Sequence, residues 1–148
     1  VSGQSPYVWA VISFAVETAM RQGEIRNLEW NDISFDRRIA RLKMTKNGTE
    51  RFVPLTLKAI QILHEQKSQE LSSPFPYTVG AVRNAWDKTL ARAGIVDLRL
   101  HDLRHEGISR FFELGLSVPE VAVISGHKDF RMLSRYTHLR AEDIVRKL

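Results

Sequence analysis

Apolar residues recur through the first part of the chain at the spacing of buried helices. A helix is expected from Ser5-Pro6 to about Met20, and its apolar residues occur on almost every side, which is typical of a central helix. A second, short helix is expected next, with Ile25 and Leu28 on one face and Trp30 at its end. The chain is therefore predicted to open with a buried helix followed by a short one.

Between residues 33 and 54 the apolar spacing changes to alternation, which predicts a small sheet of three antiparallel strands. A turn is expected at residues 36–38, and Asn47-Gly48 is a strong signal for a tight hairpin. The apolar residues of the second strand share one face: Ala40, Leu42 and Met44. The basic residues Arg41 and Lys43 lie on the other face, which predicts an exposed, basic side of the sheet.

Helical spacing returns after the sheet. Thr56 is expected to cap a helix that runs to about Glu70, and Thr78 a helix that stops at Gly94. Four more helices are expected near residues 102–114, 118–125, 130–137 and 142–148. The predicted fold class is α+β, mainly α, as one domain over residues 1–148.

The net charge, the cysteine content and the lack of long apolar runs limit the functions that this chain can have. The net charge of +5 favours a polyanionic partner, although this sign alone is weak evidence. The chain has no cysteine, which excludes disulfides, a thiolate nucleophile and a cysteine zinc site, and fits a reducing cytoplasm. No secretory signal or membrane-length apolar run is evident, and the first residues resemble a linker, so the chain is expected to begin inside a longer protein.

Residues 100–139 hold four of the five histidines and the residues best suited to phosphate chemistry. His101 and Arg104 are three positions apart, so they share one face at the start of a helix. The guanidinium of Arg104 can hold two phosphate oxygens, and His101 can move a proton near neutral pH. Because His-x-x-Arg is short and common, a solvated arginine beside a capping histidine is the competing interpretation.

The Gly126-His127 pair and Tyr136 also have both a structural and a functional interpretation. Gly126 suits a left-handed helix cap that would direct His127 outward, or His127 simply interacts with the helix dipole. Tyr136 is either a half-buried packing residue or a nucleophile. As a nucleophile it needs a base or a positive pocket, because only about one tyrosine in a thousand is ionised at pH 7.

Two other site classes compete for the same residues. Residues 116–138 have the spacing of a helix-turn-helix, in which Lys128, Arg131 and Arg135 would contact a DNA groove without chemistry. His101 and His105 are spaced like zinc ligands, but a neighbouring arginine and the lack of an obvious third ligand argue against a metal. His105 and Glu106 are instead expected in a hydrogen-bonded supporting position or on a solvated face.

Together these pieces resemble the tyrosine recombinase (phage integrase) family. His101-x-x-Arg104, Gly126-His127 and Tyr136 resemble its second conserved box. The stretches TAMRQGEIRNLEWNDI (residues 18–33) and MTKNGTERFVPL (residues 44–55) resemble its first box and its lysine hairpin. The SGHK and RYTHL stretches are similar to prophage-type integrases. The resemblance implies a catalytic domain without the family's N-terminal core-binding domain.

The resemblance implies a catalytic set of six residues: Arg21, Lys46, His101, Arg104, His127 and Tyr136. In that set the arginines bind the non-bridging phosphate oxygens, Lys46 protonates the leaving 5′ oxygen and His101 assists proton transfer. His127 hydrogen-bonds the phosphate, and Tyr136 attacks to form a 3′-phosphotyrosyl link. Glu24 is expected to support the arginines. Further DNA contacts are expected from Lys43, Arg51, Lys128, Arg131 and Arg135.

The implied partners are double-stranded DNA and other recombinase protomers, in a tetramer for the full-length complex, with no membrane, metal or cofactor. The implied location is the bacterial cytoplasm, at the nucleoid. Two residues depart from the family pattern: Glu106 stands where a small hydroxyl residue is common, and Ser125 where leucine is usual. A non-catalytic helix-turn-helix module and a tyrosine-type DNA topoisomerase stay open as alternatives.

Overall fold

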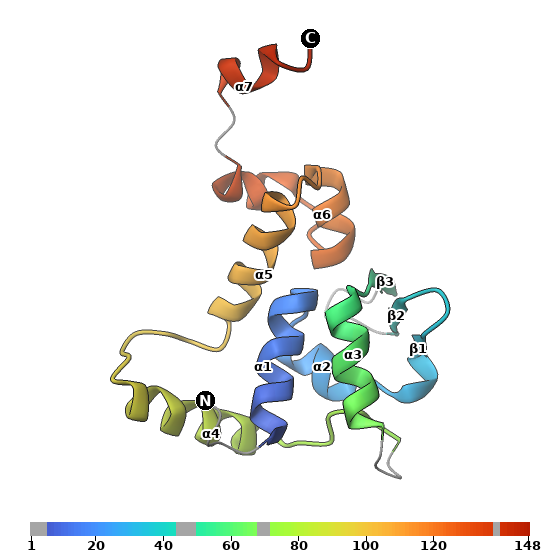
Figure 1. The fold of residues 1–148 in the computed structure, drawn as a ribbon, viewed down its shortest axis with the longest axis vertical. Helices are drawn as coiled ribbons and strands as arrows, with labels where there is room; N and C mark the ends of the chain where they lie inside the picture. The colour runs from blue at the N-terminus through green and yellow to red at the C-terminus, as the bar shows by residue number, and fades with distance from the viewer. Residues whose placement is uncertain (1–5, 44–49, 68–71, 138–139) are drawn as a thin grey trace.

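The computed structural model describes residues 6–43, 50–67, 72–137 and 140–148 (Figure 1). This part of the chain combines helices with one antiparallel sheet in the order β1-β2-β3. The predicted α+β, mainly α class is therefore confirmed. No helix within these ranges is long and apolar enough to cross a lipid bilayer.

Helix α1 (Pro6–Thr18) lies at the centre of the fold, beside α3 (Leu57–Gln66) and α5 (Asp102–Glu113) (Figure 1). Its Val11, Phe14 and Ala15 are buried, as its apolar pattern predicts. The ring of Phe14 packs 5.0 Å from that of Phe75, centre to centre. Burial of such aromatic area supplies much of the stability of a core this size.

Helix α1 ends two residues before the predicted end at Met20, for a local reason. The hydroxyl of Thr18 donates to the Phe14 carbonyl at 2.7 Å and accepts from the Met20 amide at 3.2 Å. Ala19 adopts a left-handed conformation with a φ of 57°. These features close the helix and turn the chain sharply into α2 (Gln22–Asn27), which fixes the position of Arg21.

The sheet consists of β1 (Ile33–Ser34), β2 (Ile39–Leu42) and β3 (Arg51–Pro54). Ala40 pairs with Val53, and Leu42 pairs with Arg51. Ala40 and Leu42 are buried while Arg41 and Lys43 are exposed, so the predicted faces of β2 are confirmed there. The predicted Met44 position, the Asn47-Gly48 turn and Lys46 lie outside the described residues.

The remaining helices follow the predicted order: α4 (Val79–Ala93), α6 (Val118–Ser125) and α7 (Ala141–Val145). Two details differ from the expectation. Trp30 opens a 3₁₀ turn, η1 (Trp30–Asp32), instead of ending α2. The helix expected near residues 130–137 is present, but it is a 3₁₀ helix, η2 (Phe130–Tyr136). In η2 the hydroxyls of Ser134 and Thr137 donate to carbonyls three residues back, which favours the tighter turn.

Candidate active site

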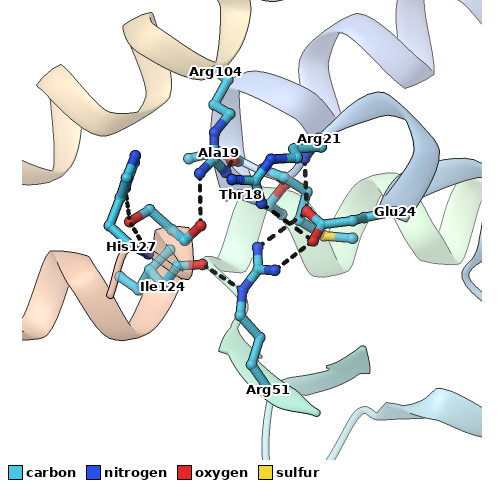
Figure 2. Close-up of polar contacts among 10 residues, drawn as sticks. Thr18, Ala19, Arg21, Glu24, Arg51, Arg104, Ile124 and His127 are labelled. Atoms are coloured by element: carbon cyan, nitrogen blue, oxygen red, sulfur yellow. Dashed lines mark hydrogen bonds and ion pairs between the residues drawn. The ribbon is translucent and has the colours of Figure 1, made fainter. Parts of the chain in front are cut away.

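Arg104 is the buried centre of the candidate site. Its side chain projects from α5, and the residue is only 4% exposed. Nη1 donates to the Ala19 carbonyl at 2.6 Å and Nη2 to the Ser125 carbonyl at 2.6 Å (Figure 2). The guanidinium thus joins the end of α1 to the end of α6, and these two bonds use only two of its five N–H groups. Burial, with a contribution from nearby Arg21, lowers the pKa of Arg104 to about 10, so it stays charged at neutral pH.

Arg21 enters the site from the turn between α1 and α2. Its backbone N–H donates to Glu24 Oε1 at 2.9 Å, and its guanidinium lies 3.6 Å from Glu24 Oε2. The Arg21 side chain is 40% exposed, so it can approach a bound phosphate. Glu24 therefore fixes Arg21 through both backbone and side chain, consistent with its expected supporting role.

Arg51 lies beneath this pair, where it is bound on two sides (Figure 2). Nη1 forms an ion pair with Glu24 Oε2, Nη2 donates to Oε1 at 3.0 Å, and Nε donates to the Ile124 carbonyl at 3.2 Å. Burial opposes ionisation of Glu24, but the bonds from Arg51 and the Arg21 amide hold its pKa below the ordinary value. Arg51 was expected to contact DNA. The structure places its guanidinium against the Glu24 carboxylate, where it supports Arg21, and its contact with DNA stays a prediction.

His127 follows α6, which ends at Gly126 with a left-handed φ of 81°. The buried Ser125 hydroxyl lies 2.6 Å from His127 Nδ1 and accepts weakly from the His127 amide at 3.4 Å. Burial, then Arg104 and Arg21, lowers the pKa of His127 to about 4, so the ring is neutral at pH 7. If Ser125 donates to Nδ1, Nε2 carries the proton and can donate to a phosphate. The departure from leucine at Ser125 therefore has a structural consequence that the sequence did not reveal.

His101 and His105 lie one turn apart at the start of α5, with ring centres 5.0 Å apart in an edge-to-face arrangement. Burial, then Arg104, lowers the pKa of His101. The Nδ1 atom of His105 contacts the Tyr136 hydroxyl. The Tyr136 ring is stacked on Phe112, with ring centres 6.0 Å apart. His105 was expected in a supporting position or on a solvated face, and its contact with Tyr136 was not foreseen.

A pocket of about 610 Å³ collects these groups. It is lined by Arg21, His101, Arg104, His105, Ile108, His127, Arg131, Met132, Ser134 and Arg135. None of these lining residues is acidic, so the pocket presents guanidinium and imidazole groups to a bound anion. Four of the six predicted catalytic residues line it, Tyr136 adjoins it through His105, and Lys46 lies outside the described residues.

The other predicted DNA-contacting residues differ in their surroundings. Lys43 lies 3.3 Å from carboxylate oxygens of both Glu29 and Asp32. Arg131 is paired with Asp129 at 2.8 Å, although its side chain is 91% exposed. Lys128 is exposed. Their contacts with DNA stay predictions.

Arg135 was likewise expected to contact a DNA groove. Its Nη2 lies 3.1 Å from the Tyr136 hydroxyl and 2.7 Å from His105 Nδ1. The structure therefore places Arg135 beside the predicted nucleophile, and its contact with DNA also stays a prediction.

The sequence and the fold of this chain are similar to those of known proteins. The chain is 49% identical to the shufflon-specific DNA recombinase of Escherichia coli over 142 residues, which cover 95% of this chain and 37% of that protein. Among solved structures, the Tn1549 transposon integrase in complex with circular intermediate DNA aligns with a TM-score of 0.76 at 16% identity, covering 95% of this chain and 56% of that one. The catalytic domain of bacteriophage HP1 integrase aligns with a TM-score of 0.69 at 22% identity, covering 91% and 76%. These two structures show that the fold is shared.

The chain spans between 34% and 41% of the length of four curated relatives. Residues 4–143, which are nearly the entire chain, match the phage integrase family. This protein belongs to the phage integrase family.

Proposed function

We propose that this chain is the catalytic part of a site-specific DNA recombinase, which cleaves and rejoins DNA through a 3′-phosphotyrosyl intermediate. The observation that carries the proposal is the convergence of Arg21, Arg104 and His127 on one pocket free of acidic lining residues, with Tyr136 beside it. Such a pocket can hold one phosphate from several sides. The helix-turn-helix module and the topoisomerase are not favoured by the family match.

The proposed chemistry is charge stabilisation at phosphorus. The two arginines and His127 donate to the non-bridging oxygens while Tyr136 attacks, and each preorganised donor is worth about 10²–10³ in rate. Lys46 is proposed to protonate the leaving 5′ oxygen, by resemblance to the family. The phosphotyrosyl ester conserves the bond energy, so rejoining needs no nucleotide cofactor.

Partners follow from the same proposal. Relatives of this fold are known bound to DNA, and a lambda integrase forms a dimer on a core site. We propose that this protein binds double-stranded DNA in the cytoplasm, at the nucleoid, and acts as a tetramer. Helix α7 stands away from the rest of the chain (Figure 1), and Ile144 and Val145 are 46% and 66% exposed. Packing of α7 against a neighbouring protomer would bury these side chains.

The decisive experiment traps the intermediate. The protein is incubated with a pool of labelled duplexes of random sequence, each nicked so that a short 5′-hydroxyl fragment diffuses away after cleavage. Denaturing gels then separate covalent protein–DNA adducts, and sequencing of the trapped DNA identifies the site. Adduct is expected from the wild type and from Tyr77→Phe, a control at a tyrosine hydrogen-bonded to Gln66, but not from Tyr136→Phe.

Two outcomes would overturn the proposal. Equal adduct from Tyr136→Phe would show that another residue is the nucleophile. Selective retention of DNA without any adduct from the wild type would favour the non-catalytic binding module.

A further inference from the structure

The hydroxyl of Tyr136 is held from two sides within the described chain. His105 contacts it through Nδ1, and Arg135 Nη2 lies 3.1 Å away. The Tyr136 ring rests against Phe112, nearly parallel to it at an angle of 21°. The stacking fixes the ring, so the hydroxyl is held against these two groups.

The position of Arg135 leaves one histidine nitrogen available to the tyrosine. Its Nη2 atom lies 2.7 Å from Nδ1 of His105 and 3.1 Å from Nε2. The lone-pair directions of the two ring nitrogens diverge, so a single atom close to both lies against the ring face. The in-plane lone pair of Nδ1 is therefore free to accept the Tyr136 hydroxyl hydrogen.

The charges around His105 favour its neutral form. Burial lowers its pKa most, and Arg135 from η2 and then His101 and Arg104 from α5 lower it further, while Asp102 opposes them. A neutral imidazole with Nδ1 unprotonated is the form that can take a proton. The guanidinium of Arg135 also stabilises negative charge on the neighbouring tyrosine oxygen.

We propose that His105 is the proton acceptor for Tyr136 and that Arg135 stabilises the phenolate as it forms. This inference rests on the proposed function. As Oη attacks phosphorus, its proton moves to His105 Nδ1 and the bond from phosphorus to the 5′ oxygen breaks. The 5′ oxygen takes its proton from a separate acid, the role assigned above to Lys46. In rejoining, the 5′ hydroxyl attacks phosphorus and His105 returns the proton to Tyr136.

The resemblance to the family assigns assistance in proton transfer to His101 instead. In the described structure it is His105 that contacts the hydroxyl, and His101 packs edge-to-face with the His105 ring, 5.0 Å away between ring centres. The two histidines therefore have different positions relative to the nucleophile. The proposal makes His105 the group that touches the reacting atom.

The test uses His105→Asn in the single-turnover cleavage of a DNA duplex identified by the trapping experiment. An asparagine amide can accept the tyrosine hydrogen bond but cannot take a proton at neutral pH. The cleavage rate at pH 7.5 is expected to fall by about 10²–10⁴-fold. The wild type is expected to lose rate at low pH, when His105 becomes protonated, and this loss is expected to disappear in the variant. His64→Asn, on α3 and stacked on Phe35, is the control and should cleave at the wild-type rate.

A modified substrate distinguishes the loss of a proton acceptor for Tyr136 from the loss of a proton donor for the leaving 5′ oxygen. In a duplex with sulfur at the 5′ bridging position, the leaving thiolate needs no proton. His105→Asn should stay slow on this duplex, because Tyr136 must still lose its proton. Lys46→Ala should recover most of its rate. Recovery of His105→Asn to the wild-type rate on this duplex would overturn the proposal, and so would an unchanged rate on ordinary DNA.

His105→Asn could also lose activity because it fails to fold. A measurement on the protein with His105 in place avoids this ambiguity. Nitrogen NMR of labelled histidines in the wild-type protein should show Nδ1 of His105 unprotonated at pH 7.5, and its signal should shift in Tyr136→Phe. A protonated Nδ1 in the wild type would overturn the inference. Absence of any adduct from the wild type would instead refute the proposed function, so the two failures are distinguishable.

Discussion

Gly107 determines how closely α5 approaches α1, and its replacement by alanine is expected to destabilise the protein. A Cβ atom at this position would lie 2.7 Å from the Val16 carbonyl oxygen and 3.1 Å from both Cα and Cβ of Ala19. Two of these three atoms belong to the backbone, so no side-chain rotation can relieve the overlap and the helices must separate. Overpacking of this kind costs about 1–3 kcal/mol, and the better helix propensity of alanine returns about 1 kcal/mol.

The net loss, up to about 2 kcal/mol, should lower the melting temperature by up to about 8 °C in calorimetric or circular dichroism unfolding. The same change should slow single-turnover cleavage, because Arg104 on α5 bonds the Ala19 carbonyl at this helix contact. Gly80→Ala is the matched control, since Gly80 is also helical but a Cβ there meets no atom within 4 Å. It should raise the melting temperature by about 2–4 °C. A Gly107→Ala protein as stable as Gly80→Ala would refute the packing argument.

Three further perturbations test other parts of the site. Glu24→Gln leaves the Arg51 guanidinium without its counter-charge and should lower the free energy of unfolding at pH 7 by about 3 kcal/mol. Because the folded-state pKa of Glu24 is lowered, that difference should be complete above about pH 4.3 and shrink as the pH falls through the folded pKa, as urea unfolding across this range would measure. Ser125→Ala removes the hydroxyl at His127 Nδ1 and should reduce cleavage about tenfold while DNA binding in a mobility-shift assay stays unchanged; weaker binding would contradict the tautomer argument. Ile144→Asp should weaken assembly of several protomers on DNA in analytical ultracentrifugation without affecting the fold of the monomer, and unchanged assembly would exclude the proposed role of α7.

The parts of the fold that depend on local chemistry were predictable from the sequence. Thr56 and Thr78 accept from backbone amides at the starts of α3 and α4, and Gly94 and Gly126 end their helices in left-handed conformations. Each of these residues determines a helix end by its own conformational or hydrogen-bonding preference. The end of α1 was misplaced because an alanine, Ala19, takes the left-handed conformation that usually signals itself by glycine.

The pairs of polar side chains around the site could not be predicted from the sequence. Glu24 and Arg51 are 27 positions apart, and His105 and Tyr136 are 31 apart. Hydrophobic periodicity assigns a residue to a face of its own helix or strand, but it does not say which residue of another element lies opposite. The strand alternation around Arg51 gives no hint that the residue packs against the α2 carboxylate. Only the packing of β3 against α6, which brings Arg51 to Glu24 of α2, decides that.

Arginine suits the buried position 104 because its side chain keeps a positive charge there. Its carbonyl partners at Ala19 and Ser125 satisfy part of the guanidinium but supply no negative charge. Arg21 and Arg51 nearby add positive charge, while Glu24 opposes them. The pKa falls from 12.5 to about 10, which at neutral pH still leaves only about one molecule in a thousand deprotonated. A lysine has a lower ordinary pKa, about 10.4, so the same burial would bring its pKa closer to neutral and would leave it less securely charged than arginine. The unpaired positive charge that burial leaves at Arg104 is relieved when an anion enters the pocket. Under the proposed function, the cost of holding this charge in the folded protein would become affinity for phosphate, and most of all for a pentacoordinate phosphorus that carries additional negative charge.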